Sequence, residues 1–144
     1  MNTRPLWRAL ESMAPIKIII PGQPLPWKAP YVGTRGAFSP RYHESQIIKK
    51  LIREQYCGDL LDGPLCCDCL FYLQIPKSTS KKRRALMLSG HIRPEGTPDR
   101  TNLAKLIEDL LQGIVIVNDK KIVDGRVAKF YSEIPETIIL VERI

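Results

Sequence analysis

One stretch of this chain, residues 98–113, constrains the fold more than any other. Its apolar residues recur at the spacing i, i+3, i+4, i+7 and i+8, which predicts an amphipathic helix with one buried face. Asp99 is a favourable N-cap residue, and Gly113 is a favourable residue just past the helix C-terminus. The residues on the buried face are Leu103, Leu106, Ile107, Leu110 and Leu111.

Short apolar runs elsewhere in the chain predict β-strands, with a turn or proline after most of them. A second helix is expected to open at Ser39 as N-cap, with Pro40 in its first position, and to end at Gly58. We therefore predict an α+β fold, a mixed sheet of about four strands packed by two or three helices. The expected strands are Ile16–Ile20, Leu65–Ile75, Ile114–Val117, Val123–Tyr131 and Thr137–Val141.

The length of 144 residues, with 44% hydrophobic, fits one globular domain. We expect an N-terminal appendage over residues 1–15, in which Leu6, Trp7 and Leu10 could form one amphipathic turn, and the domain over residues 16–144. No apolar run is long enough to span a bilayer, and the first residues lack the apolar centre of a secretory signal. The expectation is an intracellular, cytoplasmic protein without a membrane partner.

The net charge of +7 suits a polyanionic partner such as nucleic acid. Residues 77–84 carry five positive charges with hydroxyls between them, which favours contact with DNA phosphates over a merely solvated helix start. A proline-rich loop, Pro21–Pro30, and the stretch after it carry basic and aromatic residues, so DNA contact and docking on the domain are both open for Trp27 and Tyr31. The candidate DNA-binding residues are Lys28, Arg35, Lys77, Lys81, Lys82, Arg83, Arg84 and Lys120.

The four cysteines are interpreted as reduced, small core residues. Three of them lie in the expected strand at residues 65–75, where Cys67 and Cys69 share one side and Cys66 takes the other. Zinc is the alternative, but this arrangement is poor geometry for one metal site.

The helix at residues 98–113 has a polar face that carries Thr101, Lys105, Glu108 and Gln112, with Asp109 beside it. Asp99 at the helix start and Asp119 after the next expected strand add two acids. Carboxylates brought together repel, and Mg²⁺ with oxygen ligands usually resolves the repulsion. The plain alternative is that Asp99 is only an N-cap and Asp119 only a turn residue.

The order Pro98-Asp99, Asn102-Leu103, Lys105, Asp109, Gly113, Asn118-Asp119 and Lys129 resembles the RusA-type Holliday junction resolvases. The resemblance covers about residues 16–142. It implies a homodimeric endonuclease that depends on Mg²⁺, with Mn²⁺ as a substitute and no organic cofactor, and that nicks opposite strands of four-way DNA junctions. Asp99 and Asp119 would then be metal ligands, Lys105 the catalytic lysine, and Asp109 a further acidic position.

The chain departs from the family pattern at two positions, because Thr101 and Asn118 stand where the family has acids. Glu108 does not replace the acid at Thr101 within this helix, since it lies about 10 Å further along. A threonine hydroxyl can bind Mg²⁺, so Thr101 is a candidate ligand. The first hypothesis is a junction-cutting endonuclease. The rivals are a junction- or duplex-binding protein with a degenerate site, and a nuclease for flaps or nicked duplexes.

Overall fold

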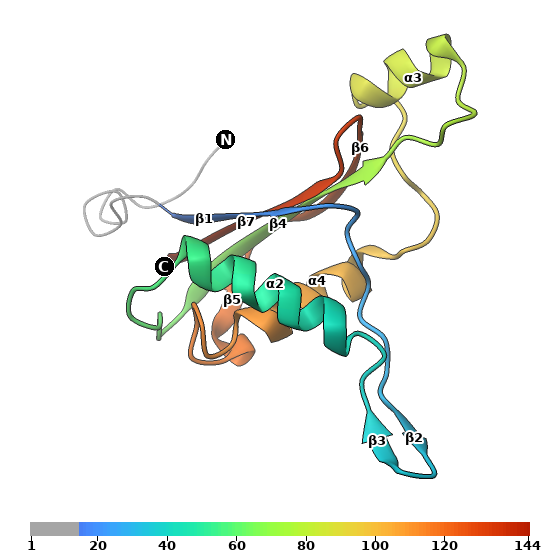
Figure 1. The fold of residues 1–144 in the computed structure, drawn as a ribbon. Coiled ribbons are helices and arrows are strands. Elements are labelled where there is room, and N and C mark those ends of the chain that lie inside the picture. The colour runs from blue at the N-terminus through green and yellow to red at the C-terminus, as the bar shows by residue number, and fades with distance from the viewer. Residues whose placement is uncertain (1–14) are drawn as a thin grey trace.

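The central strand of the fold is β4 (Leu65–Gln74), and strands on both of its sides extend it into a mixed sheet. β7 (Glu136–Arg143) pairs antiparallel with one edge of β4, and β1 (Ile16–Pro21) pairs antiparallel with β7. β5 (Ile122–Asp124) and β6 (Val127–Ser132) pair parallel with the other edge of β4. This computed structural model describes residues 15–144 (Figure 1). The α+β prediction is confirmed, with five strands in the main sheet.

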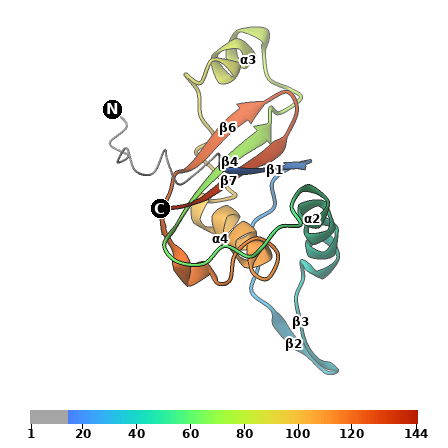
Figure 2. The ribbon, with the colours of Figure 1, turned by 90° about the vertical axis from the view of Figure 1, so that its left-hand side faces the viewer.

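Three helices and one hairpin complete the described part of the chain. α2 (Tyr42–Gln55) and α4 (Arg100–Leu111) lie on the same side of the sheet (Figure 1). α3 (Lys81–Leu88) stands beyond the ends of β4 and β6, and the hairpin β2 (Tyr31–Gly33) with β3 (Gly36–Phe38) projects at the opposite end (Figures 1 and 2). The molecule therefore has a central body and two projections.

The prediction for α4 is confirmed in its caps and in its buried face. The Asp99 carboxylate accepts a hydrogen bond from the backbone N–H of Asn102 at 2.8 Å, and Gly113 has a positive φ of 79°. All five predicted core residues of the helix are buried, as is Ala104. This packing leaves the opposite, polar face of α4 directed away from the core.

The apolar run at residues 114–117 does not form a strand, contrary to the prediction. It folds back on the end of α4, because the backbone N–H groups of Val115 and Ile116 donate to the carbonyl of Leu111. Val115 and Ile116 are fully buried, so the run is part of the core without pairing in the main sheet. Asp119 therefore follows a buried turn and begins the short 3₁₀ helix η1 (Asp119–Lys121), not a strand end.

The strand predicted at residues 123–131 is interrupted in the structure. Gly125 has a φ of 143°, and a Cβ there would overlap the carbonyl oxygen of Cys67 in β4. Arg126 follows at the break, and its backbone N–H donates to the Asp68 carboxylate at 2.8 Å. Glycine is needed at residue 125 because two backbones approach closely, and the close approach divides one strand into β5 and β6.

The boundaries predicted for the second helix are wrong by a few residues. Ser39 and Pro40 form a turn, and α2 begins at Tyr42 without a side-chain cap. The helix ends at Gln55, well before Gly58, where the Gln55 side-chain amide exchanges two hydrogen bonds with the backbone of Ile19 on β1. On the helix itself, Ile48 and Ile52 are buried whereas Ile47 is 63% exposed.

The interpretation of the cysteines as core residues is confirmed for three of the four but is wrong for Cys57, which is exposed beyond the end of α2. Cys66, Cys67 and Cys69 are buried, and the Sγ atoms of Cys67 and Cys69 lie 3.8 Å apart on one side of β4. Hydrogen bonding with Cys67 and burial raise the pKa of the Cys69 thiol well above its usual value. The expected appendage and its turn at Leu6, Trp7 and Leu10 lie outside the described residues. No helix among residues 15–144 is long and apolar enough to cross a membrane.

Candidate active site

The polar face of α4 is the candidate active site. Thr101 and Lys105 are exposed on it, and Glu108 and Asp109 are half-buried. These side chains border an open groove of about 440 Å³ between α4 and the β5–β6 connection. The groove is lined by Arg100, Thr101, Ala104, Lys105, Glu108, Gly125 and Val127.

Asp119 reaches this face from η1, which packs against the C-terminal part of α4. The backbone N–H of Asp119 donates to the side-chain oxygen of Gln112 at 3.2 Å. Asn118 accepts a hydrogen bond from the backbone N–H of Lys120 at 2.9 Å, which holds the turn. The Gln112 side chain thus fixes the turn against the end of the helix, and the Asn118 side chain holds the turn itself.

Three carboxylates interact here, and we call Glu108, Asp109 and Asp119 the carboxylate cluster. Burial first, and then the charges of Asp119 and Asp109, raise the pKa of Glu108. Burial and the charge of Asp119 raise the pKa of Asp109, although Lys105 acts in the opposite direction. The ionised forms of Glu108 and Asp109 are therefore destabilised on this face, as expected for a site that binds a cation.

Lys105 is held by an aromatic ring. Its Nζ lies 3.6 Å from the centroid of the Trp27 ring, and the backbone N–H of Trp27 donates to the carbonyl of Asn102 at 2.9 Å. Trp27 is partly buried against the core. The docking interpretation is correct for Trp27, and its contact with the proposed catalytic lysine was not foreseen.

Asp99 lies at the other end of α4, about 15 Å along the helix axis from Asp109. The loop before it is held by Lys129, whose Nζ donates to the carbonyls of Gly96 and Pro98 at 2.8 and 2.9 Å. The structure thus brings Asp119 and Lys105 to Asp109, and leaves Asp99 and Thr101 at the start of the same face.

The residues suit Mg²⁺ in chemistry, because they offer carboxylate and hydroxyl oxygens. Among residues 15–144, no three His, Cys, Asp or Glu side chains gather closely enough to hold a metal alone. Mg²⁺ commonly takes only one or two protein carboxylates, with water and substrate phosphates as its other ligands. The raised pKa values of Glu108 and Asp109 fit a site completed by a cation and a phosphate.

The predicted DNA-binding residues lie on three separate parts of the molecule. Lys28 and Arg35 are exposed on and before the hairpin, and Lys120 is exposed on η1 beside Asp119. Lys77, Lys81, Lys82 and Arg83 are exposed at α3. Arg84 is not free for DNA, because its guanidinium donates to both carboxylate oxygens of Glu133 at 2.8 Å.

A second basic region was missed by the sequence analysis. Arg93, Arg100, Arg126 and Lys129 border one groove beside α4, although they come from two segments that are separate in sequence. No local spacing signals such a group, since each residue comes from a different element or loop.

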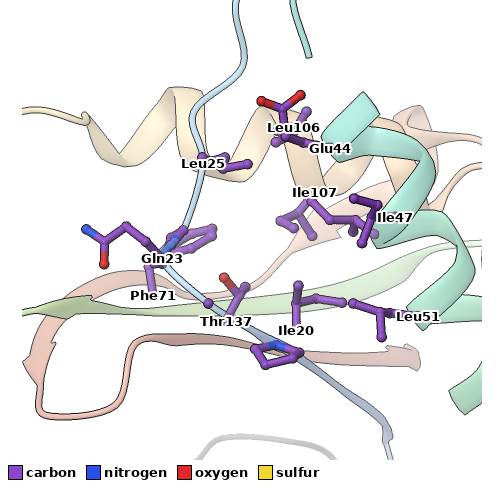
Figure 3. Close-up of a pocket in the computed structure, with 14 residues that line it drawn as sticks. Ile20, Gln23, Leu25, Glu44, Ile47, Leu51, Phe71, Leu106, Ile107 and Thr137 are labelled. Atoms are coloured by element: carbon purple, nitrogen blue, oxygen red, sulfur yellow. The ribbon is translucent and has the colours of Figure 1, made fainter. Parts of the chain in front are cut away.

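An apolar pocket of about 170 Å³ lies on the other side of α4, between α2 and residues 20–25. Figure 3 shows the side chains of Ile20, Leu51 and Ile107 around it. Among the lining residues that the structure describes, Glu44 alone is charged. It contains no pair of groups suited to phosphodiester chemistry, so the polar face of α4 is the better candidate.

Comparison with known proteins identifies the family of this chain. The family model of the endodeoxyribonuclease RusA matches residues 21–142, which include every site residue on α4 and η1. The chain belongs to the RusA endodeoxyribonuclease family. It is also 28% identical over 140 residues to the uncharacterized protein YqaN of Bacillus subtilis (strain 168), covering 90% of this chain and 96% of YqaN. Membership of the RusA family implies a metal-dependent nuclease that acts on branched DNA.

Proposed function

We propose that this chain is a Mg²⁺-dependent endodeoxyribonuclease that resolves four-way DNA junctions by paired, symmetric nicks. One observation carries the proposal: in a chain of the RusA family, Lys105 and Asp109 lie on one helix face, and Asp119 of η1 is near enough to raise the pKa of Asp109. A general base, a cation site and a positive charge near one phosphate are what phosphodiester hydrolysis needs.

The family pattern implies Asp119 and Asp99 as metal ligands, with Thr101 contributing a hydroxyl. Since Asp99 and Thr101 lie at the start of the helix face, we propose that Asp119 and Asp109 at its other end hold one Mg²⁺ and that Asp99 and Thr101 do not contact the same ion directly. When bound, Mg²⁺ would withdraw charge from the scissile phosphate and make water a stronger acid. The Asp99 carboxylate caps α4 through its contact with Asn102 and retains free lone pairs for a further ligand. Asp99 can thus cap the helix and still offer an oxygen to the site.

Lys105 is proposed to hold negative charge that develops on the phosphate or the leaving oxygen. Its ammonium group lies over the Trp27 ring, which restricts its position, and its charge lowers the pKa of Asp109 against the effect of burial. A positioned cation acts where charge develops without the cost of reorienting water.

Two copies of the chain would suit a four-way junction, which has two equivalent strands to cut. We propose a homodimer with one site per protomer. Sedimentation of the protein alone should give twice the monomer mass of 16.4 kDa. A monomer at all concentrations used for cleavage would contradict this part of the proposal.

Two conservative variants, Asp99→Asn and Asp119→Asn, test the site assignment. Asparagine is as good an N-cap as aspartate, so Asp99→Asn should leave α4 intact while it removes a charge. We expect each variant to lose cleavage of a synthetic junction by at least about a hundredfold and to keep junction binding. Cleavage at the wild-type rate by either variant would remove that residue from the site.

A second candidate function is junction binding without cleavage, which the residues Thr101 and Asn118 in place of family acids favour. It predicts salt-sensitive binding and no metal-dependent product. Replacing both residues with aspartate should then create cleavage where the wild-type chain has none. Cleavage of flap and nicked-duplex substrates, compared with cleavage of junctions at equal salt, would identify a nuclease that prefers another class of DNA.

A further inference from the structure

A groove of about 590 Å³ opens beside the start of α4, and its rim is strongly positive. Arg93, Arg100, Arg126 and Lys129 supply the charge, and none of the other lining residues is acidic. We call these four residues the arginine cradle. They come from the loop before α4, the first turn of α4, and the β5–β6 region.

The guanidinium groups of the arginine cradle are held in place by packing. The Cζ atom of Arg93 lies 3.9 Å from the centroid of the Phe130 ring, and its Nε donates to the carbonyl of Lys129 at 2.6 Å. Phe130 is in turn stacked on Tyr72 of β4, with ring centroids 5.1 Å apart. The Arg93 side chain has thus already lost much of the freedom that binding would otherwise remove.

Arg126 reaches the cradle because of the close approach at Gly125. The missing side chain at Gly125 lets the β5–β6 connection lie directly on β4. The Arg126 backbone N–H is fixed there by Asp68, and its Cζ lies 5.7 Å from the same Phe130 ring. Arg100 comes from the other side and donates to the carbonyl of Val127 at 3.4 Å.

These cations have no acidic partner in the described chain. The ion pairs within residues 15–144 are formed by Arg41, Arg84 and Lys121 instead. Two guanidinium groups that approach one aromatic ring without a counter-ion repel one another, and an anion between them would relieve the repulsion.

The cradle is continuous with the active-site groove, because Arg100, Gly125 and Val127 line both. We propose that the arginine cradle binds phosphodiester groups of the cut DNA strand, next to the scissile phosphate at Lys105. This inference rests on the proposed function and extends it, because it names how the strand is held beyond the metal site. Arginine suits such contacts, since its planar fork can donate two parallel hydrogen bonds to one phosphate.

The first test is junction binding in EDTA, where no cleavage occurs, at a series of salt concentrations. We expect Arg100→Gln and Arg126→Gln each to weaken binding about five- to twentyfold and to reduce the slope of log Kobs against log salt by about 1. The matched control is Lys50→Gln with Arg53→Gln on α2, which packs on β1 at the opposite edge of the sheet. This pair should change the slope less than either cradle variant.

The outcomes of this test separate the cradle from the function. If the wild type binds junctions and both cradle variants bind equally well with unchanged slopes, the cradle inference is wrong and the proposed function stands. If the wild type binds no DNA, both are wrong. Circular dichroism and thermal unfolding of each variant would show that a loss of binding is not a loss of fold.

A second test changes the DNA, and in one of its arms the protein is the wild type. Junctions that carry a single neutral methylphosphonate are compared at successive positions on each side of the cleavage site. At one position the wild type should lose about tenfold in affinity, whereas Arg126→Gln should lose little more than it has already lost. Strictly additive losses at every position would overturn the assignment of Arg126 to a phosphate.

Discussion

Two basic regions of this protein differ in how they arise, and the difference separates general attraction to DNA from positioning of one strand. The basic run at α3 is continuous in sequence, exposed, and located at one end of the molecule (Figure 2). The arginine cradle is scattered in sequence, packed on Phe130, and continuous with the active-site groove. Of these two regions, the cradle is the one that borders the active-site groove, although the run at α3 is far more conspicuous in the sequence.

The largest expected effect is seen when a lysine at the site and a lysine at α3 are each replaced with alanine and the two variants are compared. Lys105→Ala should lower single-turnover cleavage of a junction by about a hundredfold or more, because charge on the reacting phosphate loses its positioned partner. Lys82→Ala should change that rate by less than about threefold at saturating enzyme. Equal losses in both variants would erase the distinction between the two regions.

The next effect is on affinity. Replacing Lys81, Lys82 and Arg83 together with glutamine should weaken junction binding about tenfold to a hundredfold and lower the salt slope by about 2 to 3. The cleavage rate of bound junction should remain at the wild-type value, since α3 only attracts DNA. Arg100→Gln with Arg126→Gln should lower that rate as well, because the strand is no longer aligned. A slower rate in the α3 triple variant, measured at saturation, would contradict this division.

A smaller effect is expected at Trp27, which we consider a positioning residue for Lys105. Trp27→Leu should lower the single-turnover rate about tenfold with little change in junction affinity, because the cation loses the ring that holds it. Trp27→Phe should restore most of the rate, which a purely structural role would not require. Failure of phenylalanine to rescue a correctly folded Leu variant would show that the ring does not act through Lys105.

The smallest effect is on stability. Burial and Asp119 raise the pKa of Asp109, so its protonated form favours the fold: this contribution is complete below the unfolded-state pKa and is lost as pH rises through the folded-state pKa. Asp109→Asn should therefore raise the Tm in EDTA at neutral pH by about 1–3 °C, and the gain should vanish near pH ~3.

Asp62→Asn is the control for this prediction. The backbone N–H of Gly63 and the ion pair with Lys121 lower the pKa of Asp62, so its ionised form is the favourable one at neutral pH. Its contribution is present above the unfolded-state pKa and is lost as pH falls through the folded-state pKa. Asp62→Asn should therefore not raise the Tm at neutral pH. A higher Tm for Asp62→Asn and an unchanged Tm for Asp109→Asn would show that the negative charges of the carboxylate cluster do not destabilise the fold.

The sequence predicted those features that depend on local pattern. Helix α4, its cap at Asp99 and its buried face follow from spacing, and β4 follows from a long apolar run. The same reasoning gave a wrong prediction for residues 114–117, because a run of four apolar residues can be buried equally well in a turn.

The site was only partly predictable for a similar reason. Lys105, Asp109 and Asp119 could be chosen from their order in the chain, whereas the contact of Lys105 with Trp27 joins segments far apart in sequence. The cradle needs the close approach of Gly125 to Cys67, which no local spacing signals. Tertiary packing decides which charges share a groove.

The most direct test of the central claim is cleavage of a synthetic four-way junction beside a linear duplex of the same sequence, with Mg²⁺ and with EDTA. We expect paired nicks at symmetric positions of the junction alone, and none in EDTA. Tight junction binding without nicks, in Mg²⁺ and in Mn²⁺, would contradict it and identify Thr101 as the first residue to restore to aspartate.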